Sequence, residues 1–322
     1  MEDERKVSKR QVEVIAGVSA GFMTTLVSHP LDLIKVRLQL NRQSAKGPFG
    51  LLRLVVQDIH KSANQDYAKF LEQRKPEHAS PLTRQMKAVY LLRTYYRGVG
   101  ANLFGNVTAW SVYFSLYAEF KSRLPDTNFT LNYFGSSALA GISTSLLTNP
   151  IWVLKTRILG TPRNQENAYK SVIDGVVKII QNESIASFWR GCIPSMFSVF
   201  QASLQFTFYD HLKRVLSRSD TSTASFLSPS EYILCSTISK ALSSMLMYPA
   251  QVVRSRLQAY STSGDKKTIS SVCRQIWLHE GKWRGFYKGM GTNMLRVLPA
   301  TCVTFLSYEI VKNELVRYNR DI

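Results

Sequence analysis

The chain repeats one short motif three times, in the stretches SHPLDLIKVRLQL at 28–40, TNPIWVLKTRILG at 148–160 and MYPAQVVRSRLQA at 247–259. Each stretch has a proline followed by basic residues five and seven positions later, but only the first has an acid two positions after the proline. Two more landmarks then follow in a fixed order: YYRGVGANL, FWRGCIPSM and FYKGMGTNM, and after them SLYAEFK, TFYDHLK and LSYEIVK. Three landmarks recurring in one order predict three units of the same architecture.

Long uncharged segments, with histidine counted as neutral, surround these landmarks and lie at 14–31, 98–118, 127–154 and 191–209. Uncharged runs of about 18 residues or more can cross a bilayer as helices. In the third unit the equivalent segments keep apolar flanks but are interrupted by Lys240 and Arg296. We therefore expect an all-α membrane protein with six transmembrane helices in three repeats, in which a proline kinks the first helix of each unit.

The repeat also predicts the unit boundaries, which we place at 8–123, 127–217 and 228–318. The first unit is longer than the others because the polar segment from about 61 to 84 has no counterpart in them. The composition of this insertion suits a solvated loop or a short surface helix.

The charge balance points to an anionic partner. Among 322 residues, 41 Lys and Arg against 22 Asp and Glu give a net charge of +19, which favours nucleic acid, a phospholipid surface or a phosphorylated small molecule. The sequence has no HExxH, GxGxxG, GxxxxGK[ST] or GxSxG motif, and its four cysteines are far apart. Enzyme activity, a metal site and a disulfide framework are therefore not predicted. The N-terminal MEDERKVSKR does not resemble a secretory signal or a transit peptide.

From about residue 12 to 317 the chain resembles the mitochondrial carrier family. The motif of that family is Pro-x-[Asp/Glu]-x-x-[Lys/Arg]-x-[Lys/Arg], followed by an acid–Gly element and an aromatic, basic, Gly element. The resemblance implies a monomer with three pseudo-symmetric repeats around a central, water-filled cavity in the inner mitochondrial membrane, with cardiolipin as a candidate lipid partner. It also implies alternating access between a matrix gate and a cytoplasmic gate. The acid–Gly element is kept in EGKWRGFYKG, has Ser184 for the glycine in the second unit, and is lost in the first.

In the family's matrix gate, each acid faces the base of another unit. The contacts implied for this chain are Asp32 with Lys155, Gln251 with Lys35, and Trp152 with Arg254. Only one full ion pair is left, so we expect a weaker gate than one with three pairs. The glutamine that braces these pairs in the family is present as Gln39 and Gln258 and replaced by Leu159. A single motif of this kind is also a common pattern of helix ends, but its repetition in apolar helices favours the gate.

The cytoplasmic gate of the family has the pattern aromatic, acid, x, x, base near the end of each unit. The residues that match are Lys121, Asp210, Lys213, Glu309 and Lys312, and the first unit lacks the acid. The resemblance implies that Asp210 bridges to Lys312. It also implies that Glu309 bridges to Lys121, which leaves Lys213 without an acid. Solvated helix ends are the alternative interpretation.

Two cations inside apolar helices are candidate cargo contacts, because an unpaired charge in a bilayer is costly enough to be functional by default. Lys240 lies nine residues before Pro249, about 13 Å along a helix, and snorkelling to an interface is its alternative role. Arg296 lies seven residues after Gly289. The substrate-binding positions carried over from the family are Gly105, Asn106, Ser198, Gln201 and Arg296, and we add Trp110 and Tyr113, which lie further along the same helix face as Gly105.

The stretch NPIWVLKTR is similar to carriers of folate, FAD, NAD and pyrimidine nucleotides, and SKALSSMLMYPAQVVRSRLQ and FGNVTAWSVYFSLYAEFK are most similar to the branch that carries folate and FAD. FAD suits the cations through its diphosphate and aromatic neighbours through its flat rings. We therefore expect FAD as the transported cargo, with no prosthetic group and no nucleic-acid partner. Folate, FMN, NAD and coenzyme A are alternatives within the transporter class. A basic helical-repeat protein that binds nucleic acid is the alternative from another class, but it would not need the long uncharged segments.

Overall fold

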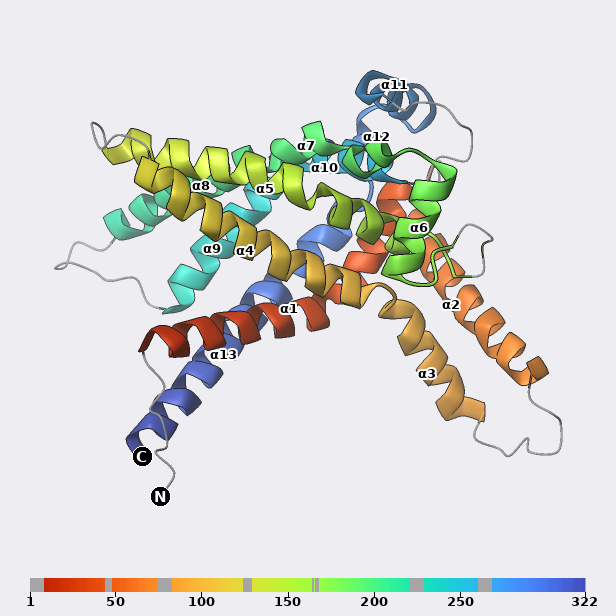
Figure 1. Ribbon diagram of the computed structural model, residues 1–322, viewed down its shortest axis with the longest axis horizontal. Coiled ribbons are helices and arrows are strands. Elements are labelled where there is room, and N and C mark those ends of the chain that lie inside the picture. The colour runs from red at the N-terminus through yellow and green to blue at the C-terminus, as the bar shows by residue number, and fades with distance from the viewer. Residues whose placement is uncertain are drawn as a thin grey trace.

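The computed structural model describes residues 9–43, 48–73, 83–123, 129–163, 165, 168–219, 229–259 and 268–321, and the regular structure in them is helical (Figure 1). The first unit contains α1 (Lys9–Leu40), α2 (Pro48–Gln73), α3 (Thr83–Tyr95) and α4 (Val99–Arg123). The second contains α5 (Phe129–Gly160), α6 (Val172–Asn182), the 3₁₀ helix η2 (Ile185–Trp189), α7 (Cys192–Met196) and α8 (Ser198–Ser219). The third contains α9 (Pro229–Leu246), α10 (Tyr248–Gln258), α11 (Ile269–His279), α12 (Trp283–Phe286) and α13 (Met290–Asp321).

The long helices associate in pairs that come from neighbouring units or from the two ends of the chain. α1 packs along α13, α4 along α5, and α8 along α9, while α1, α5 and α10 contact one another. Away from that meeting point the pairs diverge, so that the ends of α1 and α13 lie apart from those of α4 and α5 (Figure 1). The molecule is therefore closed where the three proline motifs lie and splayed at the opposite end.

The motif proline acts differently in the third unit. Pro30 and Pro150 lie inside the continuous helices α1 and α5. In the third unit α9 ends at Leu246, and Pro249 occupies the first turn of the new helix α10. Proline has no N–H and its fixed φ suits a first turn, so the predicted kink becomes a break between two helices.

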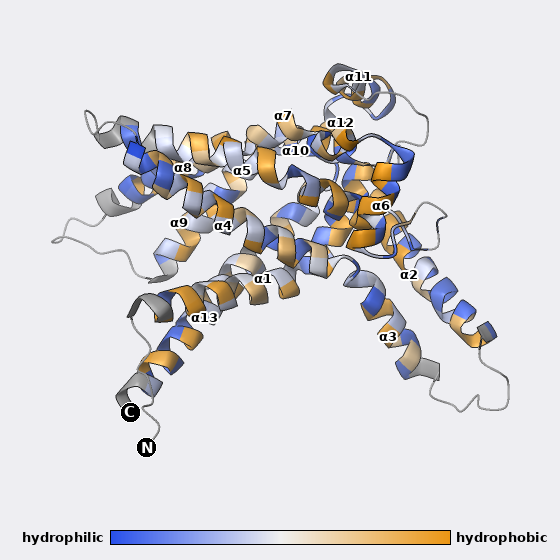
Figure 2. Cartoon of the chain, viewed as in Figure 1, coloured by the Kyte–Doolittle hydropathy of each residue, from blue (hydrophilic) through white to orange (hydrophobic). Residues whose placement is uncertain are grey.

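Three helical segments are long and apolar enough to cross a membrane: Val12–Leu40, Gly135–Gly160 and Trp283–Tyr318. The remaining three of the six expected spans do not reach this measure among the described residues. Large hydrophobic side chains are nevertheless exposed on the other long helices, such as Phe104 and Phe114 on α4. Figure 2 shows hydrophobic residues spread along α4 and α13. Apolar faces of this extent require cover, which a bilayer would supply.

The buried core lies at the closed end. One cluster joins α1, α2 and α5 through residues such as Leu33, Ile59 and Leu159, and a smaller one joins α10 and α11 through Val252 and Ile276. Because the first cluster joins helices of units one and two, it fixes how those two units meet, which in turn positions the motif residues of α1 and α5.

The insertion of the first unit lengthens a helix instead of forming a separate loop. Residues 61–73 continue α2, whereas the matching helices α6 and α11 have 11 residues each. Tyr67 is buried on α2 and its ring lies 5.7 Å from that of Tyr90 on α3. Of the two predicted alternatives, the solvated loop is therefore wrong for 61–73 and the surface helix is nearer, since these residues extend α2 and most of them are exposed. Residues 74–82 lie outside the described part of the chain.

Candidate functional site

The predicted matrix gate lies where α1, α5 and α10 meet. Lys35 Nζ donates a hydrogen bond to Gln251 Oε1 at 3.1 Å. The Arg254 guanidinium carbon lies 5.7 Å from the centre of the Trp152 ring, and Lys155 Nζ lies 4.9 Å from the same ring. The faces of an indole ring carry negative charge and attract cations. The structure thus brings Lys35 to Gln251 and Arg254 to Trp152, as the resemblance to the carrier family implies.

The single acid of the gate has a partner that was not predicted. One carboxylate oxygen of Asp32 lies 3.1 Å from Arg296 Nη1, and the other accepts a hydrogen bond from Asn102 Nδ2 at 3.3 Å. No ion pair joins Asp32 to Lys155 within the described residues. The predicted pair is wrong because α13 packs along α1 and brings Arg296 to the carboxylate, while Lys155 lies over the Trp152 ring of its own helix.

Side-chain amides extend the gate toward α8 and α9. Gln251 Nε2 donates to Gln201 Oε1 at 3.0 Å, and Gln201 Nε2 donates to Ser244 Oγ at 3.1 Å. Gln201, a candidate cargo contact, is therefore connected directly to the gate. The hydroxyl of Ser198 instead donates to the backbone carbonyl of Ser195 at 2.5 Å, so it caps its own turn.

A second layer next to the gate consists of the basic residues seven positions after each proline, Arg37, Arg157 and Arg256, which we call the arginine ring. Each Nε–H donates to the backbone carbonyl of the residue nine positions after the proline of another unit: Arg37 to Leu159 at 3.3 Å, Arg157 to Gln258 at 3.0 Å, and Arg256 to Gln39. The bonds run from unit one to two, two to three, and three to one. Because a charged donor strengthens a hydrogen bond, this cycle holds the three helix ends together.

Buried acids neutralise two members of the arginine ring. Glu183 accepts from two nitrogens of Arg157 at 2.6 and 3.1 Å, and Glu280 accepts from two nitrogens of Arg256 at 2.8 and 2.7 Å. Burial alone would raise the pKa of Glu183, but the hydrogen bonds from Arg157 outweigh burial and hold this pKa below its ordinary value. The acid of the second unit thus keeps its role although Ser184 replaces the glycine.

In the described part of the first unit, no acid forms a hydrogen bond with Arg37. The Asp58 carboxylate lies 3.6 Å from Arg37 Nη1, beyond hydrogen-bonding distance, and is 58% exposed. Both terminal nitrogens of Arg37 are buried without a hydrogen-bond partner. The acid–Gly element that the insertion removed is therefore not replaced structurally.

The residues directly before the motif prolines have a shared role that sequence reasoning missed. Their side chains donate to the carbonyl of the basic residue in each aromatic, basic, Gly element: His29 to Arg97 at 2.9 Å, Asn149 to Arg190 at 3.2 Å, and Tyr248 to Lys288 at 3.0 Å. The glycine after each acceptor has a φ of 75° to 83°, which favours glycine. A polar residue before every motif proline was the available signal, but three different residue types obscured it.

The two conserved glutamines brace neighbouring hydroxyl groups and not the gate cations. Gln39 Nε2 donates to Tyr248 Oη at 3.1 Å, and Gln39 Oε1 accepts from Ser255 at 2.8 Å. Gln258 Oε1 accepts from Thr156 at 2.9 Å. The brace implied by the resemblance is therefore corrected: both amides tie two units together within the layer of the arginine ring, where Gln39 and Gln258 also supply carbonyl acceptors.

The candidate cargo residues fall into two groups. Lys240 lies close enough to Arg296 for electrostatic repulsion, and no acid forms an ion pair with Lys240 in the described part of the chain. Asn106 Nδ2 donates to Thr25 Oγ1 at 3.2 Å. Gly105 packs against α5, since a Cβ atom there would lie 3.2 Å from Ile151. Its role is therefore corrected from cargo contact to close helix packing.

The aromatic candidates on α4 form one continuous stack. The rings of Trp110 and Tyr113 are 6.0 Å apart, Trp110 stacks on Phe114 at 5.6 Å, and Tyr113 stacks on Tyr117 at 6.1 Å. Trp110 is exposed and Tyr113 is half-buried. Trp110 therefore lies with Phe114 on the exposed apolar side of α4, and Tyr113 is the less exposed of the two candidates.

Comparison with known proteins decides the family. The family model described as mitochondrial carrier protein matches residues 8–66, 126–220 and 225–319. The chain belongs to the mitochondrial carrier family. A mitochondrial FAD carrier of Saccharomyces cerevisiae is 35% identical over 95% of this chain and 97% of the relative. A chloroplastic folate transporter of Arabidopsis thaliana is 31% identical over 92% of each chain, and a mitochondrial nicotinamide adenine dinucleotide transporter of the same plant is 29% identical over 96% of this chain and 81% of the relative.

Membership of the carrier family makes this protein a membrane transporter and not an enzyme. The names of the relatives specify mitochondria for two of these three and chloroplasts for the third. Their cargoes are anionic molecules with flat rings, which agrees with the basic composition of the chain.

At the other end of this carrier, the predicted cytoplasmic gate is not assembled. Lys312 Nζ pairs with Glu13 at 2.7 Å, and the Tyr308 hydroxyl also donates to Glu13. Lys213 lies 5.9 Å from the ring of Tyr232. No ion pair joins Asp210 to Lys312, or Glu309 to Lys121, within the described helices. Both contacts stay predictions for another state of the carrier, because in this state the ends of α4, α8 and α13 are splayed apart.

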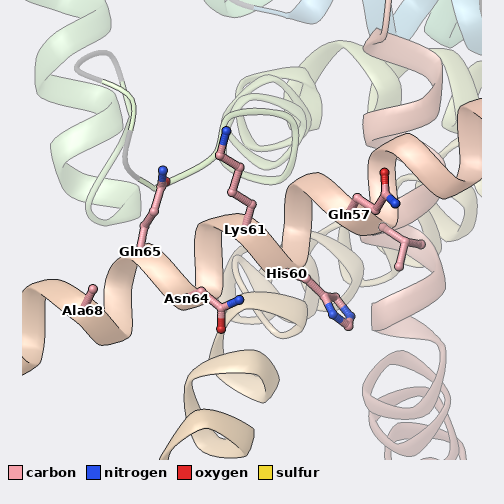
Figure 3. A pocket seen from close by; sticks show the side chains of 7 residues that line it. Gln57, His60, Lys61, Asn64, Gln65 and Ala68 are labelled. Carbon is pink, nitrogen blue, oxygen red and sulfur yellow. The ribbon is translucent and has the colours of Figure 1, made fainter.

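One surface hollow is unrelated to either gate. It has a volume of about 520 Å³ and lies on α2, where Figure 3 shows Gln57, His60, Lys61 and Asn64 along one side of the helix. All its lining residues come from α2 alone, and none of the predicted gate or cargo residues is among them. We therefore assign it no role in transport.

Proposed function

We propose that this carrier moves FAD across the inner mitochondrial membrane by alternating access, and that the structure corresponds to the state closed at the matrix gate. The observation that carries the proposal is the pair of cations, Lys240 and Arg296, on the splayed side of the closed gate. A diphosphate in a low-dielectric barrier needs compensating positive charge. These two side chains would supply it from α9 and α13.

The ion pair between Asp32 and Arg296 would couple cargo binding to the gate. In the structure, the 3.1 Å contact occupies the guanidinium with the only acid of the gate. A phosphate group on Arg296 would compete for the same N–H groups and release Asp32. The released carboxylate would then be free to leave the gate as α1 and α13 move, so that opening follows binding.

The specific cargo rests on similarity and on the aromatic stack. The relative named as an FAD carrier has the highest identity of the three reported above. Tyr113, which is half-buried and stacks on Tyr117, would offer its ring to an isoalloxazine or adenine ring. NAD is the second candidate, because it carries the same diphosphate between two rings and a relative named for NAD aligns with 96% of this chain.

Uptake by proteoliposomes tests the assignment. Purified carrier is reconstituted, and uptake of labelled FAD, FMN, NAD, folate and coenzyme A is measured with and without the same compound inside. We expect FAD uptake to exceed that of the other compounds. Robust NAD uptake without FAD uptake would reject FAD as the cargo while leaving the family assignment intact.

Two substitutions test the cargo site itself. Arg296→Ala and Lys240→Ala should each lower FAD uptake by roughly tenfold or more, because a hydrogen bond to a charged group contributes about 1.5–3 kcal/mol. The exposed cations Arg274 and Lys69 provide matched controls as Arg274→Ala and Lys69→Ala. Normal uptake by either cavity variant would remove that residue from the proposed site.

A further inference from the structure

The three members of the arginine ring occupy equivalent positions but differ in how their charge is compensated. The side chains of Arg157 and Arg256 are 0% and 6% exposed, and each meets an acid through two hydrogen bonds. The side chain of Arg37 is equally buried, at 4% exposed, but both of its terminal nitrogens lack a hydrogen-bond partner. A buried guanidinium with two unsatisfied donors is costly unless something else binds it.

A cavity lies against this guanidinium. It has a volume of about 400 Å³, and its lining includes Arg37, Asn41, Gln43, Asp58, Gly160 and Gln165. The equivalent places in the other units are filled by the carboxylates of Glu183 and Glu280. The first unit therefore has a pocket where the other two have an acid of their own.

We propose that this pocket is an anion site in which Arg37 binds the oxygen atoms of a phosphate or carboxylate group. The group would take the place of the acid that the insertion removed, with two N–H donors of Arg37 directed to two oxygens, as in the pairs formed by Arg157 and Arg256. The same chemistry is offered by a free solute such as phosphate or by an anionic lipid headgroup. The proposal does not depend on the identity of the cargo.

Asp58 lies beside this site but does not supply the missing acid. Its carboxylate is 3.6 Å from Arg37 and 58% exposed, so an incoming anion would displace it into solvent and would be repelled by it. Binding should also strengthen the closed end, because Arg37 holds the Leu159 carbonyl through its Nε–H. An occupied site would therefore favour the state closed at the matrix gate.

Thermal unfolding of the full-length carrier in non-ionic detergent tests the site, with tryptophan fluorescence as the readout. Inorganic phosphate is titrated against chloride at equal ionic strength. We expect a saturable rise of the unfolding temperature with phosphate. Asp58→Asn should lower the half-saturating concentration by roughly two- to fivefold, because it removes an exposed like charge. Asp174→Asn, which removes an exposed acid on α6 that pairs with Lys178, should not change it.

Arg37→Gln should abolish the response, and Arg284→Gln, an exposed arginine on α12, should retain it. A full phosphate response in folded Arg37→Gln would overturn the proposal. If that variant does not fold, the test rests on Asp58→Asn, and an unchanged half-saturating phosphate concentration in that variant would overturn the proposal.

A second titration replaces phosphate by phosphatidylglycerol in mixed micelles, with phosphatidylcholine as the control. A response to lipid alone that shows the same variant pattern would identify a headgroup as the source, and no response in either titration would reject the site.

Discussion

Replacing Glu280 by glutamine should destabilise the carrier more than the equivalent change in either other unit. The Glu280 side chain is 1% exposed and contacts both Arg256 and Lys288. Glutamine would leave two cations near a neutral group, and breaking a buried ion pair from one side costs about 3–5 kcal/mol. At about 2–4 °C per kcal/mol for chains of up to 250 residues, the unfolding temperature should fall on the order of 10 °C.

The repeat supplies matched controls for this prediction. Glu183 is 12% exposed and still bound by two nitrogens of Arg157, so Glu183→Gln should have an intermediate effect. Asp58 is 58% exposed and makes no hydrogen bond to Arg37, so Asp58→Asn should cost about 0–1 kcal/mol. The assay is thermal unfolding of the purified variants in one detergent, without phosphate. Equal losses for all three variants, or a loss at Glu280 below about 1 kcal/mol, would refute the argument that burial sets the cost.

Three further outcomes are expected. Asp32→Asn should lower both the KM and the maximal rate for an anionic cargo, because unpaired Arg296 would bind the cargo more tightly in its ground state; unchanged uptake kinetics would contradict the proposed coupling. Tyr248→Phe should cost about 1–3 kcal/mol in thermal unfolding, because it leaves the Lys288 carbonyl without its buried donor; an unchanged unfolding temperature would rule this out. The pKa of Glu183 is held below its ordinary value of 4.5, so its ionised form stabilises the fold above that pH. The difference in unfolding temperature between wild type and Glu183→Gln should therefore be constant above about pH 5 and shrink as the pH falls below 4.5; a difference that grows on acidification would contradict the sign.

The repeat made part of the gate predictable because equivalent positions of related units meet around one axis. The motif spacing located these positions, and the pairing implied by the family resemblance correctly brought Lys35 to Gln251 and Arg254 to Trp152. It failed for Asp32, since Arg296 belongs to no motif and reaches the gate only because α13, at the other end of the chain, packs along α1.

Roles that depend on geometry and not on residue type escaped the sequence reasoning. His29, Asn149 and Tyr248 each donate a hydrogen bond to an equivalent backbone carbonyl, but with different chemical groups. The three positions therefore share no residue type that the sequence could reveal. Glu13 was overlooked because it precedes the first motif, although it pairs with Lys312 across the contact of α1 with α13.

The sequence by itself determined the three units, the apolar helices, the family resemblance and the loss of two gate acids, because these follow from spacing and residue type along the chain. Only the tertiary structure decided which end is closed, which cation Asp32 binds, and that Arg37 is left without the acid its two counterparts have. The physical reason is that ion pairing depends on distances of a few ångströms between helices that are far apart in sequence. Those distances are fixed by the packing of all three units together and by the conformational state of the carrier.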